Sequence, residues 1–376
     1  MLFRSCKLHV GPHLRAQGDF KSHDMKQQIF ALLWSLCGAL LLAMPLAPAA
    51  HAASPCFESL PNCLQKLPLA PGPASAHAQV YASHLLDQRQ DGVEHAVVVV
   101  HGQGRNADGY FRHAMAGAFL AHALHRTVII SPRIASNNKR SCADVLEPGE
   151  ANWLCSGPDS WRVGGPAQNF EGMNSFQVMD EILRLLARKD RFPALQTVRV
   201  IGHSAGGQYV SRYAMANVFH EQLGLQIEYV VGNPSSYTYL DDLRPQATTG
   251  KTGFEFSSGS SLGACNGFNQ WPYGSERRMG VAKTLDEPTL KRQLISRPVT
   301  YLLGELDILP LYGFDDSCSA MAQGPTRLAR GQAYAQYVNE KLGAKHRVIV
   351  VPACGHDARC MFSSESALEL IYKRGR

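Results

Sequence analysis

The residues best suited to covalent chemistry are two serines, each inside a Gly-x-Ser-x-Gly pattern. The pattern reads GHSAG around Ser204 and GSSLG around Ser261. It consists of common residues, so its context decides its meaning. Ser204 follows the apolar run VRVI and precedes a segment of helical period, the strand–turn–helix setting that exposes a nucleophilic hydroxyl above a sheet. Ser261 lies in a loop of small residues. We therefore predict that Ser204 is a nucleophile and that Ser261 is a chance match.

A serine hydroxyl becomes a nucleophile when a base removes its proton and a carboxylate orients that base. Downstream of the serine, VTYLLGELDILP presents Asp307 directly after an expected strand, and RVIVVPACGHDARC presents His356 after the last one. The order serine, acid, histidine is the one that accompanies such a turn in an open α/β sheet. We predict Asp307 as the acid and His356 as the base. Glu305, closer to the strand end, is the main alternative acid, and the aspartates at 315–316 lie farther along the loop.

An oxyanion formed at the serine needs backbone N–H donors. One should come from Ala205, and the other from Gln103 in the HGQG loop that follows the run VVVV. Gly102, Gly104 and Ala107 also imitate a dinucleotide-binding fingerprint, but such a site needs an acidic residue at the end of the next strand. The next run, TVIISPRI, has none. We therefore expect no cofactor, and the lack of HExxH and CxxC motifs gives no reason to expect a metal.

These residues must be positioned by an α/β sheet. Continuous apolar runs alternate with segments of helical period, as expected for strands that are buried on both faces of a parallel sheet and joined by helical crossovers. The expected strands are 96–100, 127–131, 198–202, 228–232, 299–304 and 347–351. The expected helices are 111–125, 175–189, 206–221, 331–342 and 364–372.

Two long irregular segments, 133–169 and 233–297, interrupt this alternation. Segments of this length are usually lids or binding loops, and a disulfide-pinned excursion is the alternative. Both follow strand ends, where open α/β sheets bind ligands, so we expect 233–297 to form a lid or cap. Four aromatic residues are candidates for substrate binding, with core packing as the alternative for each. They are Tyr110, Trp161, Tyr237 and Trp271.

The first 52 residues have the character of an N-terminal extension and a signal peptide. From Met25 the chain has a positive charge at Lys26, an apolar run at 29–44 and a small-x-small site, AHA, at 50–52. The apolar run is shorter than the roughly 20 residues of a membrane span, and a retained anchor is the alternative. We predict a start at Met25, cleavage after the AHA site, a mature domain at 53–376, and a periplasmic or secreted location without membrane association after cleavage.

Eight cysteines lie beyond the expected cleavage site. An even number in an exported chain indicates disulfides, although the connectivity does not follow from the number. Closeness in the sequence favours the pairs Cys56–Cys63, Cys142–Cys155, Cys265–Cys318 and Cys354–Cys360. The last pair would clamp the loop that carries the expected base.

Composition and charge give no sign of a nucleic-acid partner. The chain is 45% hydrophobic and 18% charged, as in an ordinary globular protein. Half of the formal net charge of +6 falls within the first 52 residues, and no basic run is interleaved with aromatics. We therefore exclude a nucleic-acid surface.

Four motifs together resemble those of the α/β-hydrolase superfamily, in the family's order and over most of the expected domain. They are HGQG at 101–104, GHSAG at 202–206, GELD at 304–307 and GHD at 355–357. The segment HGQGRNADGYF is similar to that of secreted bacterial esterases, including polyhydroxyalkanoate depolymerase-like and feruloyl-esterase-like members. The resemblance implies an eight-stranded, mostly parallel sheet, an acyl-enzyme mechanism and no cofactor. The long cysteine-bearing insert departs from the family pattern, so the resemblance does not identify the substrate.

The sequence thus predicts an exported serine hydrolase, and most simply a carboxylic ester hydrolase acting on a small or polymeric ester. A peptidase or amidase with the same machinery is one alternative. A non-catalytic binding protein on a hydrolase scaffold is another, and it is disfavoured because the nucleophile, its two partners and both oxyanion elements are all present.

Overall fold

The computed structural model describes residues 56–57, 59, 61–70, 72–247, 253–261, 263 and 265–372. The chain divides after Ala52, and every described residue belongs to the second unit, Ala53–Arg376. The expected signal peptide and its cleavage site lie outside the described residues. Within those residues, no helix is both long and apolar enough to cross a bilayer.

An eight-stranded sheet forms the centre of this unit. The strands are β1 (Leu64–Pro68), β2 (His77–Ala82), β3 (His95–Val100), β4 (Thr127–Arg133), β5 (Thr197–His203), β6 (Gln226–Gly232), β9 (Val299–Gly304) and β10 (Arg347–Val351). Their order in the sheet is β1-β2-β4-β3-β5-β6-β9-β10. β2 runs antiparallel to both β1 and β4, and all other neighbours are parallel. Parallel neighbours need crossover connections, which the helices supply.

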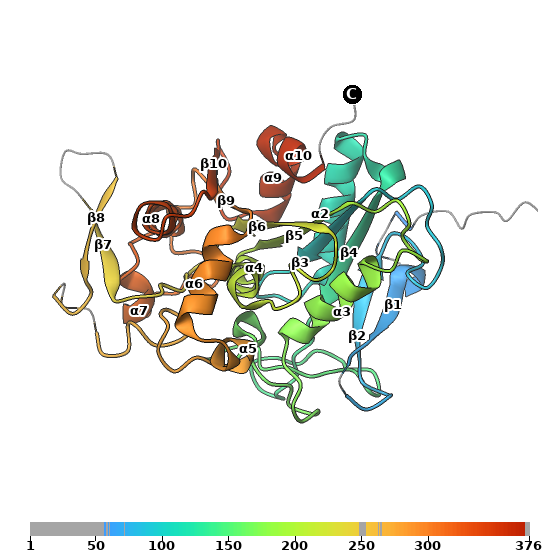
Figure 1. Cartoon of the computed structure of the whole chain (residues 1–376), viewed down its shortest axis with the longest axis horizontal. Coiled ribbons are helices and arrows are strands. Elements are labelled where there is room, and N and C mark those ends of the chain that lie inside the picture. The colour runs from blue at the N-terminus through green and yellow to red at the C-terminus, as the bar shows by residue number, and fades with distance from the viewer. Residues whose placement is uncertain are drawn as a thin grey trace, which may run out of the picture. The chain divides into compact units, whose positions relative to one another are not determined.

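Helices cover both faces of the sheet, which makes three layers (Figure 1). The helices are α2 (Ala107–Leu120), α3 (Phe176–Leu186), α4 (Ala205–Ala216), α5 (Gly280–Thr284), α6 (Glu287–Ser296), α7 (Cys318–Met321), α8 (Arg327–Gln336), α9 (Ala358–Ser363) and α10 (Glu365–Tyr372). Shorter helical turns are η1 (Pro61–Cys63), η2 (Leu124–Arg126), η3 (Trp161–Val163) and η4 (Tyr337–Lys341). One face carries α2, α9 and α10, and the other carries α3, α4, α6 and α8.

The side chains of the central strands alternate between two hydrophobic cores. In β3, Val98 and Val100 pack on the side of α3 and α4, whereas Val97 and Val99 pack on the side of α2. Every residue of β5 is buried. Because both faces are covered, these strands read as continuous apolar runs, which is why the sequence predicted them.

All six expected strands are present as β3, β4, β5, β6, β9 and β10, and the bounds of the last two are those expected. The expected helices are present as α2, α3, α4, α8 and α10, with α8 continued by η4. α2 begins one turn earlier than expected, because the helix starts directly after the HGQGRN segment, with Asn106 at its N-cap. The sequence did not indicate β1, β2 or the separate hairpin of β7 (Leu243–Ala247) and β8 (Phe254–Ser258).

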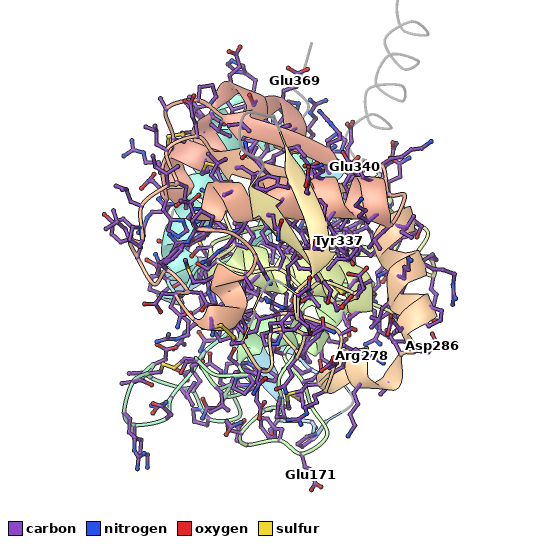
Figure 2. All side chains as sticks on the ribbon, turned by 90° about the vertical axis from the view of Figure 1, so that its left-hand side faces the viewer. Glu171, Arg278, Asp286, Tyr337, Glu340 and Glu369 are labelled. Atoms are coloured by element: carbon purple, nitrogen blue, oxygen red, sulfur yellow. A yellow bond between two sulfur atoms is a disulfide. The ribbon has the colours of Figure 1, made fainter. Side chains whose placement is uncertain are left out.

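The segment 233–297 has two parts in the structure. Its first part contains the β7–β8 hairpin, which faces the viewer in Figure 2. Phe256 of this hairpin packs 6.0 Å from the ring of Tyr337, which is labelled there. The second part ends in α6, whose Leu290 and Leu294 are buried in the core that also includes α4. α6 therefore covers the sheet, and only the part before it could act as a lid.

Candidate active site

Ser204 lies at the sharp turn between β5 and α4, with φ 60° and ψ −119°. This conformation is strained for a residue that has a Cβ, and the surrounding structure must enforce it. The Ser204 N–H donates to the carbonyl of Gly232 at 2.9 Å, and its own carbonyl accepts from the Gln208 N–H at 3.0 Å. These bonds tie the turn to the end of β6 and to the first turn of α4, with the serine side chain at the C-terminal edge of the sheet.

The glycines after Ser204 are required by close backbone contacts. A Cβ at Gly206 would overlap the carbonyl oxygen of Val100, and one at Gly207 would lie 2.5 Å from the carbonyl oxygen of Gly232. Backbone atoms in a packed sheet cannot move away to make room. The sequence GHSAGG therefore allows α4 to begin directly against the strand ends.

Ser204, His356 and Asp307 form one chain of hydrogen bonds. His356 Nε2 lies 2.9 Å from Ser204 Oγ, and His356 Nδ1 lies 2.7 Å from Asp307 Oδ2. A carboxylate that accepts from Nδ1–H leaves Nε2 free to accept the serine proton. Glu305, the alternative acid, is exposed and instead accepts the N–H of Ala353 at 2.8 Å. The three residues come from the ends of β5, β9 and β10, as the sequence analysis expected.

The loop after β10, which carries the histidine, is held from two directions. Cys354 and Cys360 form a disulfide across it, with their Cα atoms 5.8 Å apart. Asn233 donates from Nδ2 to the carbonyl of Gly355 at 3.2 Å and accepts the N–H of Gly304 at 2.8 Å. Asn233 therefore joins the end of β9 to the histidine loop, which fixes the separation of acid and base.

A buried arginine holds the acid. Arg327 Nη1 donates to Asp307 Oδ1 at 3.4 Å, and both side chains are almost fully buried. Arg327 also donates from Nε to Ser235 Oγ at 2.8 Å and from Nη2 to the carbonyl of Leu311 at 2.8 Å. The guanidinium pairs with the carboxylate and fixes the loop after β9.

The expected oxyanion donors lie beside Ser204. Gln103 lines the same cavity, of about 360 Å³, as Ser204. Ala205 is the first residue of α4, where backbone N–H groups have no partner inside the helix. For the N–H of either residue, the described part of the chain provides no acceptor. A negative oxygen formed at Ser204 can therefore accept hydrogen bonds from both.

His101 anchors the start of the oxyanion loop as a neutral ring. Its Nε2 accepts the N–H of Ile134 at 3.0 Å, so its Nδ1 carries the proton, 3.0 Å from the carbonyl oxygen of Gly102. Burial lowers the pKa of His101 to about 4. The neutral ring connects the oxyanion loop to the end of β4.

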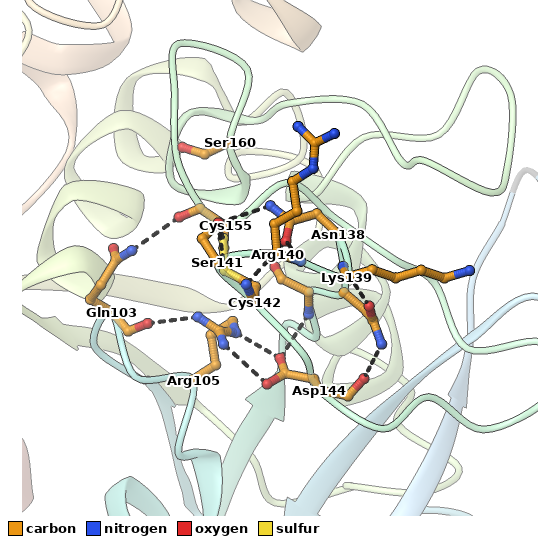
Figure 3. Close-up of a disulfide and its surroundings, with 12 residues drawn as sticks. Gln103, Arg105, Asn138, Lys139, Arg140, Ser141, Cys142, Asp144, Cys155 and Ser160 are labelled. Carbon is orange, nitrogen blue, oxygen red and sulfur yellow. Dashed lines mark hydrogen bonds and ion pairs between the residues drawn. A yellow bond between two sulfur atoms is a disulfide. The ribbon is translucent and has the colours of Figure 1, made fainter.

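The irregular segment between β4 and α3 holds the other side of the oxyanion loop (Figure 3). Gln103 Nε2 donates to the carbonyl of Cys155 at 3.1 Å, and Cys155 is disulfide-bonded to Cys142. Arg105 pairs with both oxygens of Asp144 at 2.6 and 3.1 Å and donates to the carbonyl of Gln103 at 3.0 Å. The disulfide and the ion pair thus position the backbone of Gln103.

Tyr110 and His203 form a polar pair beneath the base. The Tyr110 hydroxyl lies 3.1 Å from His203 Nδ1, and the rings of His203 and His356 lie 4.6 Å apart. Burial, and then the charge of His356, hold the pKa of His203 well below its usual value. A neutral His203 does not repel His356 when His356 takes up a proton.

The four aromatic residues expected to bind substrate differ in their positions. Tyr110 lines the cavity at Ser204, and Trp271 lines an adjoining cavity of about 600 Å³. Trp161 and Tyr237 are fully buried in the core, so the expectation that they contact substrate is wrong. Trp161 packs edge-on against the ring of His101, and Tyr237 stacks on an aromatic ring of α8, because these loop side chains turn inward to fill space under the site.

Three positioning residues were not identified from the sequence: Asn233, Arg327 and His203. Asn233 gave a usable signal, because an asparagine directly after a strand often adopts the left-handed conformation, and its φ is 44°. No feature of the sequence indicates the role of Arg327, because the residue type alone does not show whether an arginine is buried.

Ser261 has none of these partners. Its side chain is exposed, and its hydroxyl donates to the carbonyl of Ser258, the last residue of β8, at 2.7 Å. In the described residues no histidine or carboxylate is hydrogen-bonded to Ser261.

All four disulfides expected from closeness in the sequence are present. Two of them, Cys142–Cys155 and Cys354–Cys360, support the two loops that meet at Ser204. The other two, Cys56–Cys63 and Cys265–Cys318, join segments outside those loops. Across the described residues, no three His, Cys, Asp or Glu side chains are grouped to hold a metal ion.

Neither a family model nor a curated protein matches this chain. Among solved structures, a poly(3-hydroxybutyrate) depolymerase from Bordetella parapertussis is 22% identical, with a TM-score of 0.52 over 81% of this chain and 86% of that one. Poly(aspartic acid) hydrolase-1 from Sphingomonas sp. KT-1 is 20% identical, with a TM-score of 0.51 over 82% of this chain and 98% of that one. With the strand order and the turn at Ser204, these likenesses show that the chain has the α/β-hydrolase fold.

Proposed function

We propose that this protein is a serine hydrolase that cleaves carboxylic esters through an acyl-enzyme intermediate. The observation that carries the proposal is the hydrogen-bonded chain from Ser204 through His356 to Asp307, at 2.9 and 2.7 Å. These are the distances that general base catalysis requires. The N–H groups of Gln103 and Ala205, which have no acceptor among the described residues, support the second requirement, a site for the oxyanion.

The reaction follows from this geometry. His356 Nε2 removes the proton of Ser204 as its Oγ attacks the ester carbonyl, and the resulting oxyanion accepts from the two N–H groups. His356 then donates the proton to the departing alkoxide, which leaves the acyl group on Ser204. Water then attacks the acyl carbonyl as it loses a proton to His356. The bond between the acyl group and Ser204 Oγ breaks, His356 returns the proton to Oγ, and the carboxylic acid is released. Asp307 stays ionised throughout and stabilises the protonated imidazole, helped by Arg327.

We also propose that the protein acts outside the cytoplasm. The support is the signal-like N-terminal sequence and four disulfides among the described residues, because disulfides persist in oxidising compartments. Intact-mass measurement of the protein recovered from a periplasmic or culture fraction tests this. A mass that still includes residues 25–52 would contradict cleavage.

The enzymatic proposal is tested with p-nitrophenyl esters of graded acyl length and, in parallel, aminoacyl anilides. We expect ester hydrolysis that a fluorophosphonate abolishes by labelling Ser204, and much slower anilide hydrolysis. Faster turnover of the anilides would indicate a peptidase or amidase. No turnover of either class, with no label on Ser204, would indicate a binding protein.

A further inference from the structure

The cavity at Ser204 adjoins a second cavity of about 600 Å³, and the two share Gln103 and Gly313 in their walls. The second cavity lies between the irregular segment before α3, the middle of the segment 233–297 and the loop after β9. Gln208 and Arg212 of α4 also line it, and so does Arg162 of η3. We call it the arginine cavity.

Helix α4 connects the nucleophile to this cavity. Ser204, Gln208 and Arg212 follow one another at intervals of four residues, so they lie on one face of the helix. At 1.5 Å per residue, Gln208 and Arg212 lie about 6 and 12 Å from Ser204 along the helix axis. Arg162 Nη1 donates to Gln208 Oε1 at 3.3 Å, which places its guanidinium near the first of these positions.

The two arginines carry positive charge that no carboxylate neutralises directly. Within the described residues, neither Arg162 nor Arg212 has a carboxylate oxygen within ion-pair distance. Arg212 is 1% exposed and donates to Thr238, to Ser236 and to two backbone carbonyls, all of them neutral acceptors. These neutral partners do not cancel the charge of the Arg212 guanidinium, which therefore contributes a positive field at the cavity.

Arg162 also has an unused donor. Its Nε donates to Ser160 Oγ at 3.3 Å, and Nη1 donates to Gln208, but the described residues contain no partner for Nη2. Arg162 lines the cavity, so this nitrogen can meet a ligand. Burial lowers the pKa of Arg162, and the nearby Asp315 raises it. A guanidinium stays charged under all such conditions and matches a carboxylate in shape.

Two carboxylates line the same cavity and do not cancel this charge. Asp315 already accepts from the Tyr273 hydroxyl at 2.9 Å and from the Ser317 N–H at 3.1 Å. Its charge also acts on the buried Arg330. Asp316 is exposed at the rim. Neither aspartate forms an ion pair with Arg162 or Arg212, so among the described residues the two guanidinium groups are not directly paired at this cavity.

The position of the base shows which part of an ester enters the arginine cavity. His356 must donate a proton to the leaving alcohol, so the alcohol lies on the side of His356. His356, Tyr312 and Ala358 line the cavity at Ser204, and none of them lines the arginine cavity. The acyl group therefore extends the other way, past Gln103.

We propose that the arginine cavity binds a carboxylate at the far end of the acyl group, so that the preferred substrates are half-esters of short dicarboxylic acids. In this arrangement Arg162 is the residue that contacts the carboxylate, and Arg212 adds to the positive field behind it. The proposal rests on the proposed ester hydrolase function, because it assumes that an acyl group is bound at Ser204.

The test compares mono-p-nitrophenyl succinate, glutarate and adipate with the matching esters whose free acid is replaced by a primary amide. For at least one chain length we expect kcat/KM to be about 10- to 100-fold higher for the acid than for the amide, as for other charge-assisted hydrogen bonds. The variant Arg162→Gln should reduce this ratio to about one. Arg140→Gln is the matched control, since Arg140 is an exposed arginine of the same irregular segment (Figure 3), and it should keep the wild-type ratio.

Two further measurements separate the possible failures. An acid-to-amide ratio near one in the wild type, or a high ratio that Arg162→Gln does not change, would overturn the carboxylate site; hydrolysis that depends on Ser204 would still support the ester hydrolase. No hydrolysis of any ester, or hydrolysis that persists in Ser204→Ala, would overturn the proposed function itself.

A comparison of phenyl acetate with 4-carboxyphenyl acetate tests the alcohol side of the ester. A preference for the charged alcohol would contradict the assignment of the cavity to the acyl group.

Discussion

The two Gly-x-Ser-x-Gly segments of this chain differ in what surrounds the hydroxyl. At Ser204 a parallel strand and a helix force the serine to φ 60°, and a histidine lies 2.9 Å from its oxygen. At Ser261 the hydroxyl is exposed and bonds to a nearby backbone carbonyl. The difference teaches that the strands around a Gly-x-Ser-x-Gly segment decide what its hydroxyl contacts. At Ser204, the HGQG loop, Asp307 and His356 each follow a different strand of the sheet.

The largest expected change in kcat comes from removing the hydroxyl of Ser204, and the comparison is tested by removing each hydroxyl in turn. Ser204→Ala should lower kcat by about four to six orders of magnitude, and His356→Ala should do about the same, with the double variant hardly worse. Ser261→Ala is the matched control and should change kcat by no more than about twofold. Steady-state kinetics with a p-nitrophenyl ester measures all four. Full turnover by Ser204→Ala, or a fluorophosphonate label on Ser261, would reverse the roles of the two segments.

Substitution of Asp307, the proposed acid, should have the next largest effect on kcat. Asp307→Asn should lower kcat by about three to four orders of magnitude, because the amide favours the wrong tautomer of His356. Glu305→Gln, two residues away, should cost no more than about tenfold, since Glu305 only holds the backbone of Ala353. If the two effects were exchanged, the acid would be Glu305.

Low pH should reduce the stability of the folded protein through His101, which lies in the network around Ser204. The folded state holds the pKa of His101 near 4, below the ordinary value of about 6.5 in an unfolded chain. The stability contributed by the neutral ring is complete above pH 6.5 and is lost as the pH falls from about 6.5 to 4, because only the unfolded state binds the proton in that range. The loss is about 3 kcal/mol.

Urea unfolding at several pH values measures this effect, with His101→Gln as the comparison. The variant should be less stable than the wild type at neutral pH and should lose less stability on acidification. Parallel pH dependence in the two proteins would show that His101 is not the titrating group.

The Cys142–Cys155 disulfide should have a smaller effect that is confined to the rate. Replacing both cysteines by alanine removes the support behind Gln103 and should lower kcat about tenfold with little change in KM, because the oxyanion donor is displaced. The matched control is the Cys56→Ala, Cys63→Ala pair at the β1 end of the sheet, which should keep kcat. Equal losses of kcat in both pairs would mean that the disulfides act only through overall stability.

Much of this site could be predicted because the sheet presents its residues in order. Continuous apolar runs located β3, β5, β9 and β10, and the residues directly after these strands include Gln103, Ser204, Asp307 and His356. Parallel strands place their carboxyl ends at one edge, so order along the chain became closeness in space.

The rest depends on contacts that have no local pattern. β1 and β2 lie at the antiparallel edge, and polar residues interrupt their apolar ones, so they do not read as continuous apolar runs. Trp161 and Tyr237 lie in loops, yet their side chains complete the core. The pairing of Arg327 with Asp307 and the cavity next to Arg162 depend on how distant segments pack, which periodicity does not report.

The orientation of the Ser204 side chain has a consequence for stability. Ser204 occupies the N-cap position of α4 but makes no side-chain cap hydrogen bond, because its hydroxyl is directed to His356. At an ordinary N-cap, replacing serine by alanine costs about 1 kcal/mol. Here Ser204→Ala should leave the melting temperature unchanged to within about 2 °C, and a larger drop in a thermal scan would contradict this. The helix forgoes its side-chain cap because the hydroxyl that would provide it is held by His356 instead. On the proposed function, this turn keeps its hydroxyl for catalysis at the expense of stability.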